Sequence, residues 1–186
     1  DVGDGGPNPI KIVESESGVK KIAAGCYHLL LIKENNSLWG MGANWNWQLG
    51  VNSGSLNDDY YSYPVEIASE VKDIVAGNDH SLFLKEDGSL WGMGDKWSLG
   101  MGEGGTQYTP GLIVESGVVK IGAEEWFSAF IKEDGSLWAM GTNNYGGGSE
   151  DLRLVPEKLV ESGVSDLALG WGYCLFTKGT AYAEQP

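Results

Sequence analysis

Basic residues are scarce in this chain of 186 residues. Lysine and arginine together number 12, against 26 aspartate and glutamate residues, and the formal net charge is −14 at pH 7. A protein that binds nucleic acid needs a cluster of positively charged side chains to displace the counterions of the phosphate backbone. We therefore expect no nucleic-acid partner. We interpret the acidic surface mainly as a source of solubility, with attraction of a basic partner as a less favoured use.

Cysteine and long apolar runs are scarce as well. The two cysteines, Cys26 and Cys174, allow one disulfide but form neither a disulfide framework nor a zinc-binding pattern. No stretch approaches the roughly 18–20 continuous apolar residues of a membrane span, and no hydrophobic signal segment stands at the start. The sequence therefore predicts no membrane span. Because the first residue is Asp1 rather than Met, we expect a processed form or an excised piece.

One phrase occurs three times with little change, which identifies a tandem repeat. It reads LIKENNSLWGMG from Leu31, LKEDGSLWGMG from Leu84 and IKEDGSLWAMG from Ile131. Its tryptophans, Trp39, Trp91 and Trp138, are 52 and 47 residues apart, and Tyr182 in a degraded fourth copy follows after 44. A unit of this length with short, glycine-bounded strands is typical of a propeller blade. Such units stack into a scaffold, so function should lie where the copies differ.

Each repeat predicts four short strands. The first holds a proline followed three residues later by Ile or Leu, at Pro9, Pro64, Pro110 and Pro156. The second is a segment of the form Val-x-x-Ile or Val-x-x-Leu, from Val19, Val71, Val118 and Val164. The third reads HLLLIK, HSLFLK, FSAFIK or YCLFTK, and its apolar residues on both faces predict burial on both sides. A tight type I′ hairpin at 35–36, 87–88 and 134–135 leads into the fourth, Ser-Leu-Trp.

In this order the segments resemble a known repeat. The combination of AAG-x-x-H-x-L-x-L-K, D-G-S-L-W-x-x-G, N-x-x-x-Q-L-G and a returning P-V-x-I is similar to the repeat of the regulator of chromosome condensation family, over essentially all 186 residues. The resemblance implies a β-propeller, in that family usually of seven blades. The Gln-Leu-Gly segment is clear only at 48–50, is shortened around 99–100, and is replaced by three glycines at 146–148. Those loops are where the copies have diverged.

We expect a single all-β repeat domain over residues 1–186, a β-propeller or propeller arc of about four repeats of 44–52 residues. The repeats run approximately over 9–63, 64–109, 110–155 and 156–186, the last truncated, and residues 1–8 match the end of a preceding loop between strands. The decay of the last copy favours a true C-terminus or a terminal cap.

Four units are fewer than the usual ring of the family. This leaves a closed small ring, an open arc completed by another chain, or a fragment that lacks N-terminal blades. A bridge between Cys26 and Cys174 is conceivable only in a closed ring or between two chains. We expect both to be unpaired, because one falls in a loop and the other in a strand predicted to be buried on both faces.

The residues that could carry chemistry recur with the repeat or lack partners. His28 and His80 share a repeat position that Phe127 and Tyr173 fill in the other copies. Since a catalytic or metal-binding histidine would not be replaceable by Phe, we interpret both as structural residues at a blade edge. The Gly-x-Gly pairs are strand ends rather than dinucleotide fingerprints, and the acidic segment at 57–59 lacks the alternating ligands of a calcium loop. We expect no catalytic residue, no metal site and no cofactor.

Aromatic residues that do not recur are the candidates for binding, whereas the recurring tryptophans are expected in the core between blades. One group lies in the long loops after the fourth strands: Trp45, Trp47, Trp97 and Tyr145. A second group lies between the second and third strands: Tyr27, Asp79, Trp126 and Trp171. Equivalent loops of successive blades line up around one face of a propeller, so these residues should form one patch. Tyrosine and tryptophan are the usual anchors of protein interfaces. The alternative is that they only pack over the blade ends.

We therefore predict a non-enzymatic protein-binding scaffold that uses one loop face. The resemblance implies a secreted or cell-surface protein of bacterial type. As the least favoured alternative, the resemblance also implies guanine nucleotide exchange activity, which the founding members of the family have. A second hypothesis is a structural subunit that completes or extends its propeller as a homo-oligomer, in a ring or filament. A third is glycan binding or cleavage, for which Glu124 and Glu125 are the only tempting pair, although adjacent residues of an extended segment point to opposite sides.

Overall fold

The computed structural model describes residues 18–52, 59–103, 105–143, 151–170 and 173–179. Over these residues the chain is all β, with no helix. Trp171 and Tyr145 of the predicted patch lie outside the described residues, as do the first predicted strand at Pro9 and the degraded segment around Tyr182.

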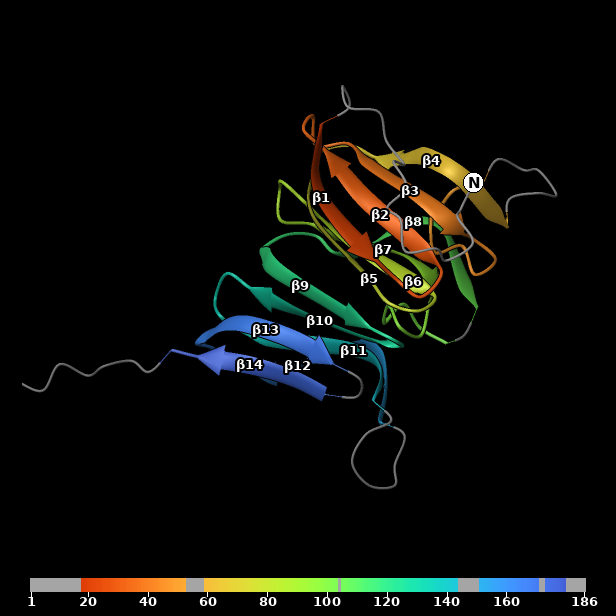
Figure 1. The fold of residues 1–186 in the computed structure, drawn as a ribbon. Helices are drawn as coiled ribbons and strands as arrows, with labels where there is room; N and C mark the ends of the chain where they lie inside the picture. The colour runs from red at the N-terminus through yellow and green to blue at the C-terminus, as the bar shows by residue number, and fades with distance from the viewer. Residues whose placement is uncertain (1–17, 53–58, 104, 144–150, 171–172, 180–186) are drawn as a thin grey trace, which may run out of the picture.

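The described strands form four antiparallel sheets, which we number as blades 1 to 4 (Figure 1). Blade 1 contains β1 (Val19–Ala24), β2 (His28–Lys33), β3 (Leu38–Ala43) and β4 (Tyr60–Ala68). Blade 2 contains β5 (Val71–Ala76), β6 (His80–Lys85), β7 (Leu90–Asp95) and β8 (Thr106–Val114). Blade 3 contains β9 (Val118–Glu124), β10 (Phe127–Lys132), β11 (Leu137–Asn143) and β12 (Asp151–Val160), and blade 4 contains β13 (Val164–Gly170) and β14 (Tyr173–Lys178).

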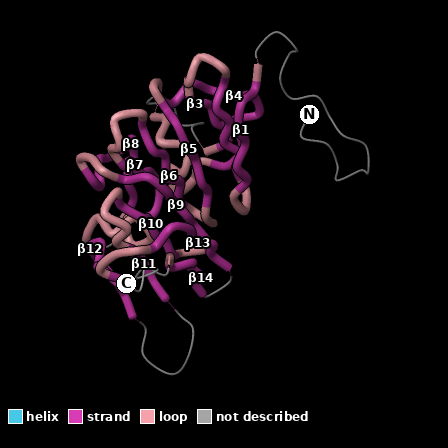
Figure 2. The backbone as a smooth tube through the Cα atoms, turned by 90° about the vertical axis from the view of Figure 1, so that its left-hand side faces the viewer, coloured by secondary structure: helices cyan, strands magenta, loops and turns pink. Residues whose placement is uncertain are grey.

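The blades follow one another through the molecule as an open arc. In Figure 1, blade 1 lies at the top and blade 4 at the bottom, and Figure 2 shows the same succession from the side. The first strand of each blade contacts the first strand of the next, from β1 to β5, β9 and β13. The described blades therefore form a propeller arc rather than a closed ring of four.

The strands that carry proline lie one blade earlier than their place in the repeat predicts. Sequence order makes each of them the opening strand of a repeat. In the structure, β4 with Pro64 pairs with β3 and closes blade 1, and β8 and β12 do the same for blades 2 and 3. Each is the last strand of its sheet, where a residue without an N–H group is tolerated. The sheets are thus offset by one strand from the sequence repeats.

The hairpin that leads from the third to the fourth strand of each repeat, β6 to β7 in blade 2, is not the predicted type I′ turn. A type I′ turn needs positive φ at both central residues, yet in blade 2 only Gly88 has it, with φ 79°. Gly88 N donates to the Lys85 carbonyl at 3.1 Å, and Lys85 N donates to the Ser89 carbonyl at 3.0 Å, as in a type I turn followed by a left-handed residue. The cause is Asp87, whose carboxylate accepts hydrogen bonds from Ser89 N at 2.9 Å and Ser89 Oγ at 2.6 Å and so favours this turn.

The recurrent Asp-Gly-Ser-Leu-Trp phrase forms a hydrogen-bond relay. Trp91 Nε1 donates to Ser89 Oγ at 2.9 Å, and that hydroxyl donates to Asp87. The same relay occurs in the other complete blades, through Asn35, Ser37 and Trp39 and through Asp134, Ser136 and Trp138. The predicted core position of the tryptophans is confirmed in part. Trp91 and Trp138 pack against core clusters and stack on Phe83 and Phe130, with ring centroids 6.2 and 6.1 Å apart, but each remains half-buried.

Among the described residues, the core consists of three apolar clusters, each between two successive blades. Phe83 of β6 packs toward blade 1, together with Leu30 and Ile32. Leu82 and Leu84 of the same strand pack toward blade 3. Burial of this strand on both faces is therefore confirmed, because alternate residues of a strand point to opposite sides. The third cluster joins blades 3 and 4 and includes Ala129, Ile131 and Leu167.

Candidate functional site

The loops that carry the predicted binding residues lie at one end of the sheets, which we call the loop face. The β1–β2 loop and the β3–β4 loop begin at the same end of blade 1, because His28 at the start of β2 pairs with Gly42 near the end of β3. The same register holds for His80 with Gly94 and for Phe127 with Gly141. Six of the predicted residues, Tyr27, Trp45, Trp47, Asp79, Trp97 and Trp126, therefore lie in loops of this face.

Successive blades connect to one another directly at the loop face. Asn78 N donates to the Glu125 carbonyl at 3.0 Å, which joins the β5–β6 loop to the β9–β10 loop. Between blades 1 and 2, the Gly77 carbonyl lies so close to Gly25 that a Cβ on Gly25 would be 2.5 Å from it. The first loops of blades 1, 2 and 3 thus form one continuous row.

Tyr27 and Trp45 form an exposed aromatic pair at the blade 1 end of this row. Their ring centroids are 5.5 Å apart and their planes are inclined by 57°. The two residues come from different loops, and both remain exposed to solvent. A side-chain hydrogen bond with Cys26 is the main cause that raises the pKa of the Tyr27 phenol, and the charge of Asp79 adds a smaller effect. The pair stays neutral and offers a broad apolar surface with one polar tip.

Trp47 is less exposed than the other described aromatic residues of the predicted patch. Its ring makes an edge contact with Tyr108 of β8 in blade 2, with centroids 5.1 Å apart and planes at 81°. The loop around it is fixed from within, since Asn44 Oδ1 accepts from Leu49 N at 3.0 Å and Leu49 is fully buried in the core. Trp47 is therefore half-buried and packs between two blades, which is the alternative role considered for these aromatic residues.

Trp97 and Trp126 are exposed, and Asp79 is half-buried. Trp97 occupies the position in blade 2 that Trp47 occupies in blade 1, three residues before a glycine with positive φ. The Asp79 carbonyl accepts from Asp95 N at 2.9 Å, so its backbone ties two loops of blade 2 together. The structure thus places exposed aromatic side chains on the loop face of each of the three complete blades.

Beneath the loop face, two buried histidines link successive blades. His28 Nε2 lies 2.8 Å from Ser81 Oγ of blade 2, and Ser81 Oγ donates to the Gln48 carbonyl at 2.7 Å. Because the hydroxyl proton is used in that bond, Ser81 accepts from His28, which must carry its proton on Nε2. His80 Nε2 lies 2.8 Å from Ser128 Oγ of blade 3, the equivalent pair one repeat later.

Burial lowers the pKa of His28 to about 4 and that of His80 to about 3, so both are neutral at pH 7. Their interpretation as structural residues agrees with this geometry. Sequence reasoning missed the serine partners, although a signal was present. Where a repeat carries His28 or His80, the next repeat carries a serine, Ser81 or Ser128, directly after the same position. Where a repeat carries Phe127 there, the next repeat carries Cys174 instead.

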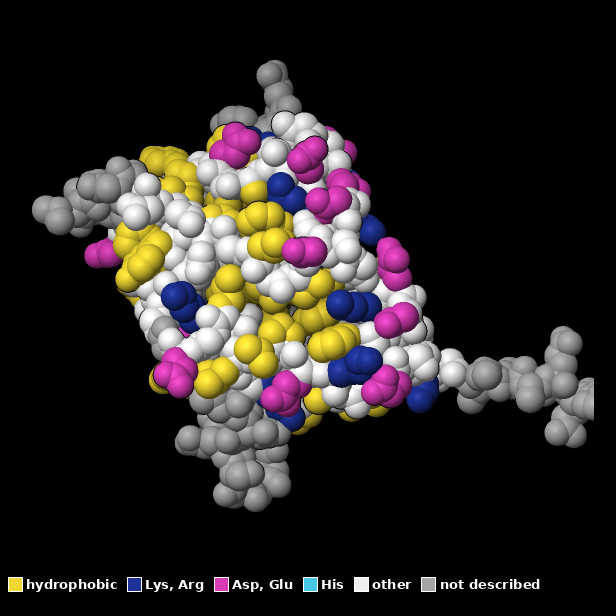
Figure 3. Space-filling view, turned by 180° about the vertical axis from the view of Figure 1, so that it is seen from behind, with side chains coloured by type: hydrophobic (Ala, Val, Ile, Leu, Met, Phe, Trp, Pro, Cys, Tyr) yellow, Lys and Arg dark blue, Asp and Glu magenta, His cyan; other side chains and the backbone are white. Residues whose placement is uncertain are grey.

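Within the described residues, no group of three or more His, Cys, Asp or Glu side chains could hold a metal ion. Across the same ranges, no helix is long and apolar enough to cross a membrane. Acidic and basic side chains are interspersed around hydrophobic patches on the face in Figure 3, without a continuous basic stripe. Cys26 and Cys174 are both unpaired. Cys174 differs from expectation in one respect, because its strand β14 is mostly exposed rather than buried on both faces.

The comparison with known proteins identifies the repeat. The family model described as the regulator of chromosome condensation (RCC1) repeat matches residues 71–95, which span β5, β6 and β7. Residues 71–95 thus match this repeat, and the described blades have the architecture of an RCC1-like repeat propeller. The ultraviolet-B receptor UVR8 of Arabidopsis thaliana is 29% identical over 119 residues, which are 62% of this chain and 26% of the receptor.

Two solved structures share the fold of these RCC1-type repeats. Human WBSCR16 superposes with a TM-score of 0.74 at 23% identity, over 87% of this chain and 45% of that protein. Yeast RCC1 (Prp20), solved bound to Kap60, superposes with a TM-score of 0.71 at 20% identity, over 89% of this chain and 43% of that protein. The chain thus spans less than half of the length of these relatives, and the likeness establishes the β-propeller fold.

Proposed function

We propose that this chain is a non-enzymatic protein-binding scaffold that contacts its partner through the loop face. The observation that supports this most is the continuous row of loops that presents exposed aromatic side chains from three successive blades. Tyr27 with Trp45, Trp97, and Trp126 are each exposed, while the blades beneath them are joined by buried hydrogen bonds. Rigid aromatic anchors on a fixed frame lose little conformational entropy on binding, which favours a protein interface.

The solved relatives are compatible with this use of the fold. Yeast RCC1 (Prp20) is described in complex with Kap60, and Prp20p from Saccharomyces cerevisiae is described with binding properties toward Gsp1p and histones. These partners belong to those proteins. For this chain the proposal includes only a protein partner, and it includes an extracellular or cell-surface location on the strength of the resemblance in the sequence. Fractionation of the source cells tests the location.

A matched pair of substitutions in blade 3 tests the loop face. Trp126 and Leu159 are equally exposed, at 42% and 43%, but Leu159 lies near the end of β12, at the opposite end of the sheet. The wild type is first used to capture proteins from the source organism. Calorimetry then measures the affinity of each captured protein for the wild type and for both variants. Trp126→Ala should weaken binding by about 2 kcal/mol, roughly 30-fold, with an almost unchanged melting temperature, and Leu159→Ala should bind as the wild type does.

Two results would count against the proposal. If Trp126→Ala lowers the melting temperature by several degrees but leaves binding unaltered, Trp126 is a packing residue. If the purified chain turns over a glycoside, ester or peptide, and Glu124→Gln or Glu125→Gln abolishes the activity, the glycan-cleaving hypothesis replaces this one.

A further inference from the structure

The two ends of the arc expose apolar residues whose counterparts in blade 2 are buried. At the blade 1 end, Val19 and Ile22 of β1 are 41% and 74% exposed. Their counterparts in β5, Val71 and Ile74, are 0% and 1% exposed because they pack against blade 1. The outer face of β1 therefore has the composition of a junction between blades, without a neighbour among the described residues.

The blade 4 end has the complementary composition. Tyr173 and Leu175 of β14 are 62% and 67% exposed, although their counterparts in β6, His80 and Leu82, are fully buried. A hollow of about 320 Å³ lies here, lined by Asp166, Leu167, Ala168, Leu175, Phe176 and Thr177. In blade 1 the positions of Ala168 and Leu175 are held by Ala23 and Leu30. Leu30 belongs to the same core cluster as Ile74 of blade 2, and Ala23 packs against that cluster. The hollow is thus the place that an isoleucine of a following blade would fill.

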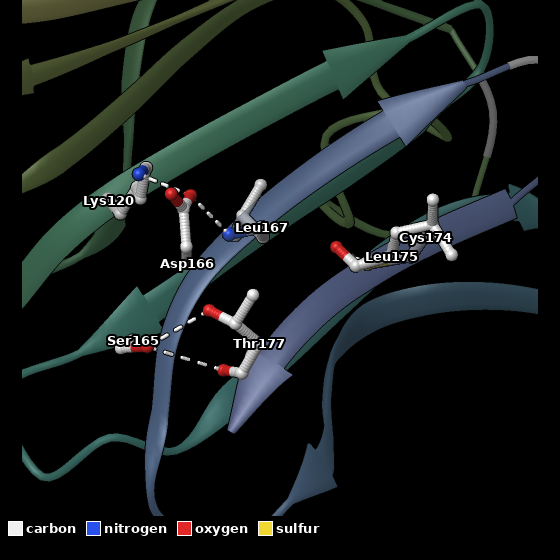
Figure 4. A network of polar contacts seen from close by, with 7 residues as sticks. All are labelled: Lys120, Ser165, Asp166, Leu167, Cys174, Leu175 and Thr177. Atoms are coloured by element: carbon white, nitrogen blue, oxygen red, sulfur yellow. Dashed lines mark hydrogen bonds and ion pairs between the residues drawn. The ribbon is translucent and has the colours of Figure 1, made fainter. Parts of the chain in front are cut away.

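Charges along the inner strands alternate in sign. One position of the Val-x-x-Ile segment carries Lys21 in blade 1, Asp73 in blade 2, Lys120 in blade 3 and Asp166 in blade 4. Lys21 forms an ion pair with Asp73, and Lys120 forms one with Asp166. Figure 4 shows the second pair between β9 and β13, beside the bond from Ser165 to Thr177. The residue that continues this alternation after Asp166 is a lysine, and Lys21 is the lysine at the other end of the arc.

From this complementarity we infer that a second copy of this chain joins the arc head to tail. The blade 4 face of each copy packs against the blade 1 face of the other, and Ile22 fills the hollow over Ala168 and Leu175. Lys21 then lies next to Asp166. Two such junctions close a ring with twofold symmetry. A head-to-head arrangement would instead bring Lys21 against Lys21, and a tail-to-tail arrangement would bring Asp166 against Asp166, and such like-charge contacts disfavour both.

Sedimentation and light scattering of the 186-residue chain test the ring. The wild type should have twice the 20.0 kDa mass of one chain at micromolar concentration. Ile22→Asp blocks the head and Leu175→Asp blocks the tail, so each variant alone should be monomeric, with a dissociation constant raised at least ~100-fold. Because both side chains are largely exposed, the variants should retain the wild-type circular dichroism spectrum. Leu159→Asp, which places the same charge away from both ends, should remain dimeric.

A mixture of the two blocked variants distinguishes the arrangement. The Ile22→Asp chain keeps a free tail and the Leu175→Asp chain keeps a free head, so the mixture should form a heterodimer through one junction although neither variant associates alone. A monomeric wild type at 100 μM would overturn the inference. So would a Leu175→Asp variant that stays dimeric, which indicates head-to-head contact, or a mixture of the two variants that remains monomeric.

Discussion

His80 of blade 2 and Ser128 of blade 3 share a buried hydrogen bond, with Nε2 and Oγ 2.8 Å apart. One repeat earlier, His28 and Ser81 are joined in the same way. One repeat later, Phe127 and Cys174 occupy the two positions and both pack against the third core cluster. The two residues of the pair are thus either both polar or both apolar. This is expected because an unpaired buried polar group costs more free energy than a matched apolar contact.

This relationship predicts strong coupling between the two positions. His80→Phe alone and Ser128→Cys alone each leave one polar group without its partner, and each should lower the free energy of unfolding by about 1–3 kcal/mol. The double variant copies the natural Phe127–Cys174 pair, so it should recover at least half of the summed loss. Urea unfolding of the four proteins measures the coupling. Additive losses would show that the two side chains act independently.

The histidines also predict a pH dependence of stability. Their pKa values in the folded protein, about 4 for His28 and about 3 for His80, lie below the ordinary value of 6.5. As the pH falls, the unfolded chain therefore takes up these protons first, so the stabilisation present above pH 6.5 is lost as the pH falls toward 4. Between pH 7.5 and 5.5, each histidine should contribute a loss of about 1.4 kcal/mol.

Urea unfolding at the two pH values measures this loss. The variant carrying both His80→Phe and Ser128→Cys retains only His28 and should lose about half as much as the wild type. This pH window lies above the ordinary range of carboxylate titration, so the acidic surface contributes little. Equal stability of the wild type at both pH values would contradict the burial of neutral histidines.

The relay through Ser89 predicts a combined effect on stability and on a carboxylate. The hydrogen bonds from Ser89 are the main cause that lowers the pKa of Asp87. Ser89→Ala removes the hydroxyl that joins Asp87 to Trp91 and should destabilise the fold by about 1–3 kcal/mol. It should also raise the pKa of Asp87, which carboxyl carbon chemical shifts follow by NMR. An unchanged pKa in a folded variant would refute the relay.

Substitution of two glycines that share the same φ distinguishes the cost of backbone strain from the cost of steric crowding. Gly88 and Gly117 both have φ 79°. A Cβ on Gly88 would lie 3.0 Å from Gly117 N, whereas a Cβ on Gly117 would meet nothing within 4 Å. Gly117→Ala should therefore cost only the left-handed backbone conformation, about 1 kcal/mol, and Gly88→Ala clearly more. Thermal unfolding of both variants decides this, and equal losses would show that the hairpin moves away from blade 3 at little cost.

Much of the architecture follows from local sequence. The β class was predictable. So was the burial of β6, the third strand of its repeat, on both faces, since Leu82, Phe83 and Leu84 are apolar on alternate sides. The placement of six loop residues at one end followed from strand order alone. The turn type was wrong because the Asp87 carboxylate, rather than glycine alone, selects the turn. The assignment of the strand with Pro64 to the following blade was wrong. This strand, β4, pairs with β3, and the repeat pattern does not show that long-range pairing.

The sequence by itself determined the repeat, its strand periods and the positions where copies diverge, because these depend on side-chain alternation and glycine placement within a few residues. Only the tertiary structure decided which of the divergent residues are exposed. Trp47 and Trp97 occupy equivalent positions, yet Trp47 packs against Tyr108 and Trp97 remains open to solvent. Likewise, Ile22 and Ile74 stand in the same sequence pattern, and only the presence of a preceding blade buries Ile74. Burial is set by neighbours distant in the chain, so identical local patterns end in opposite environments.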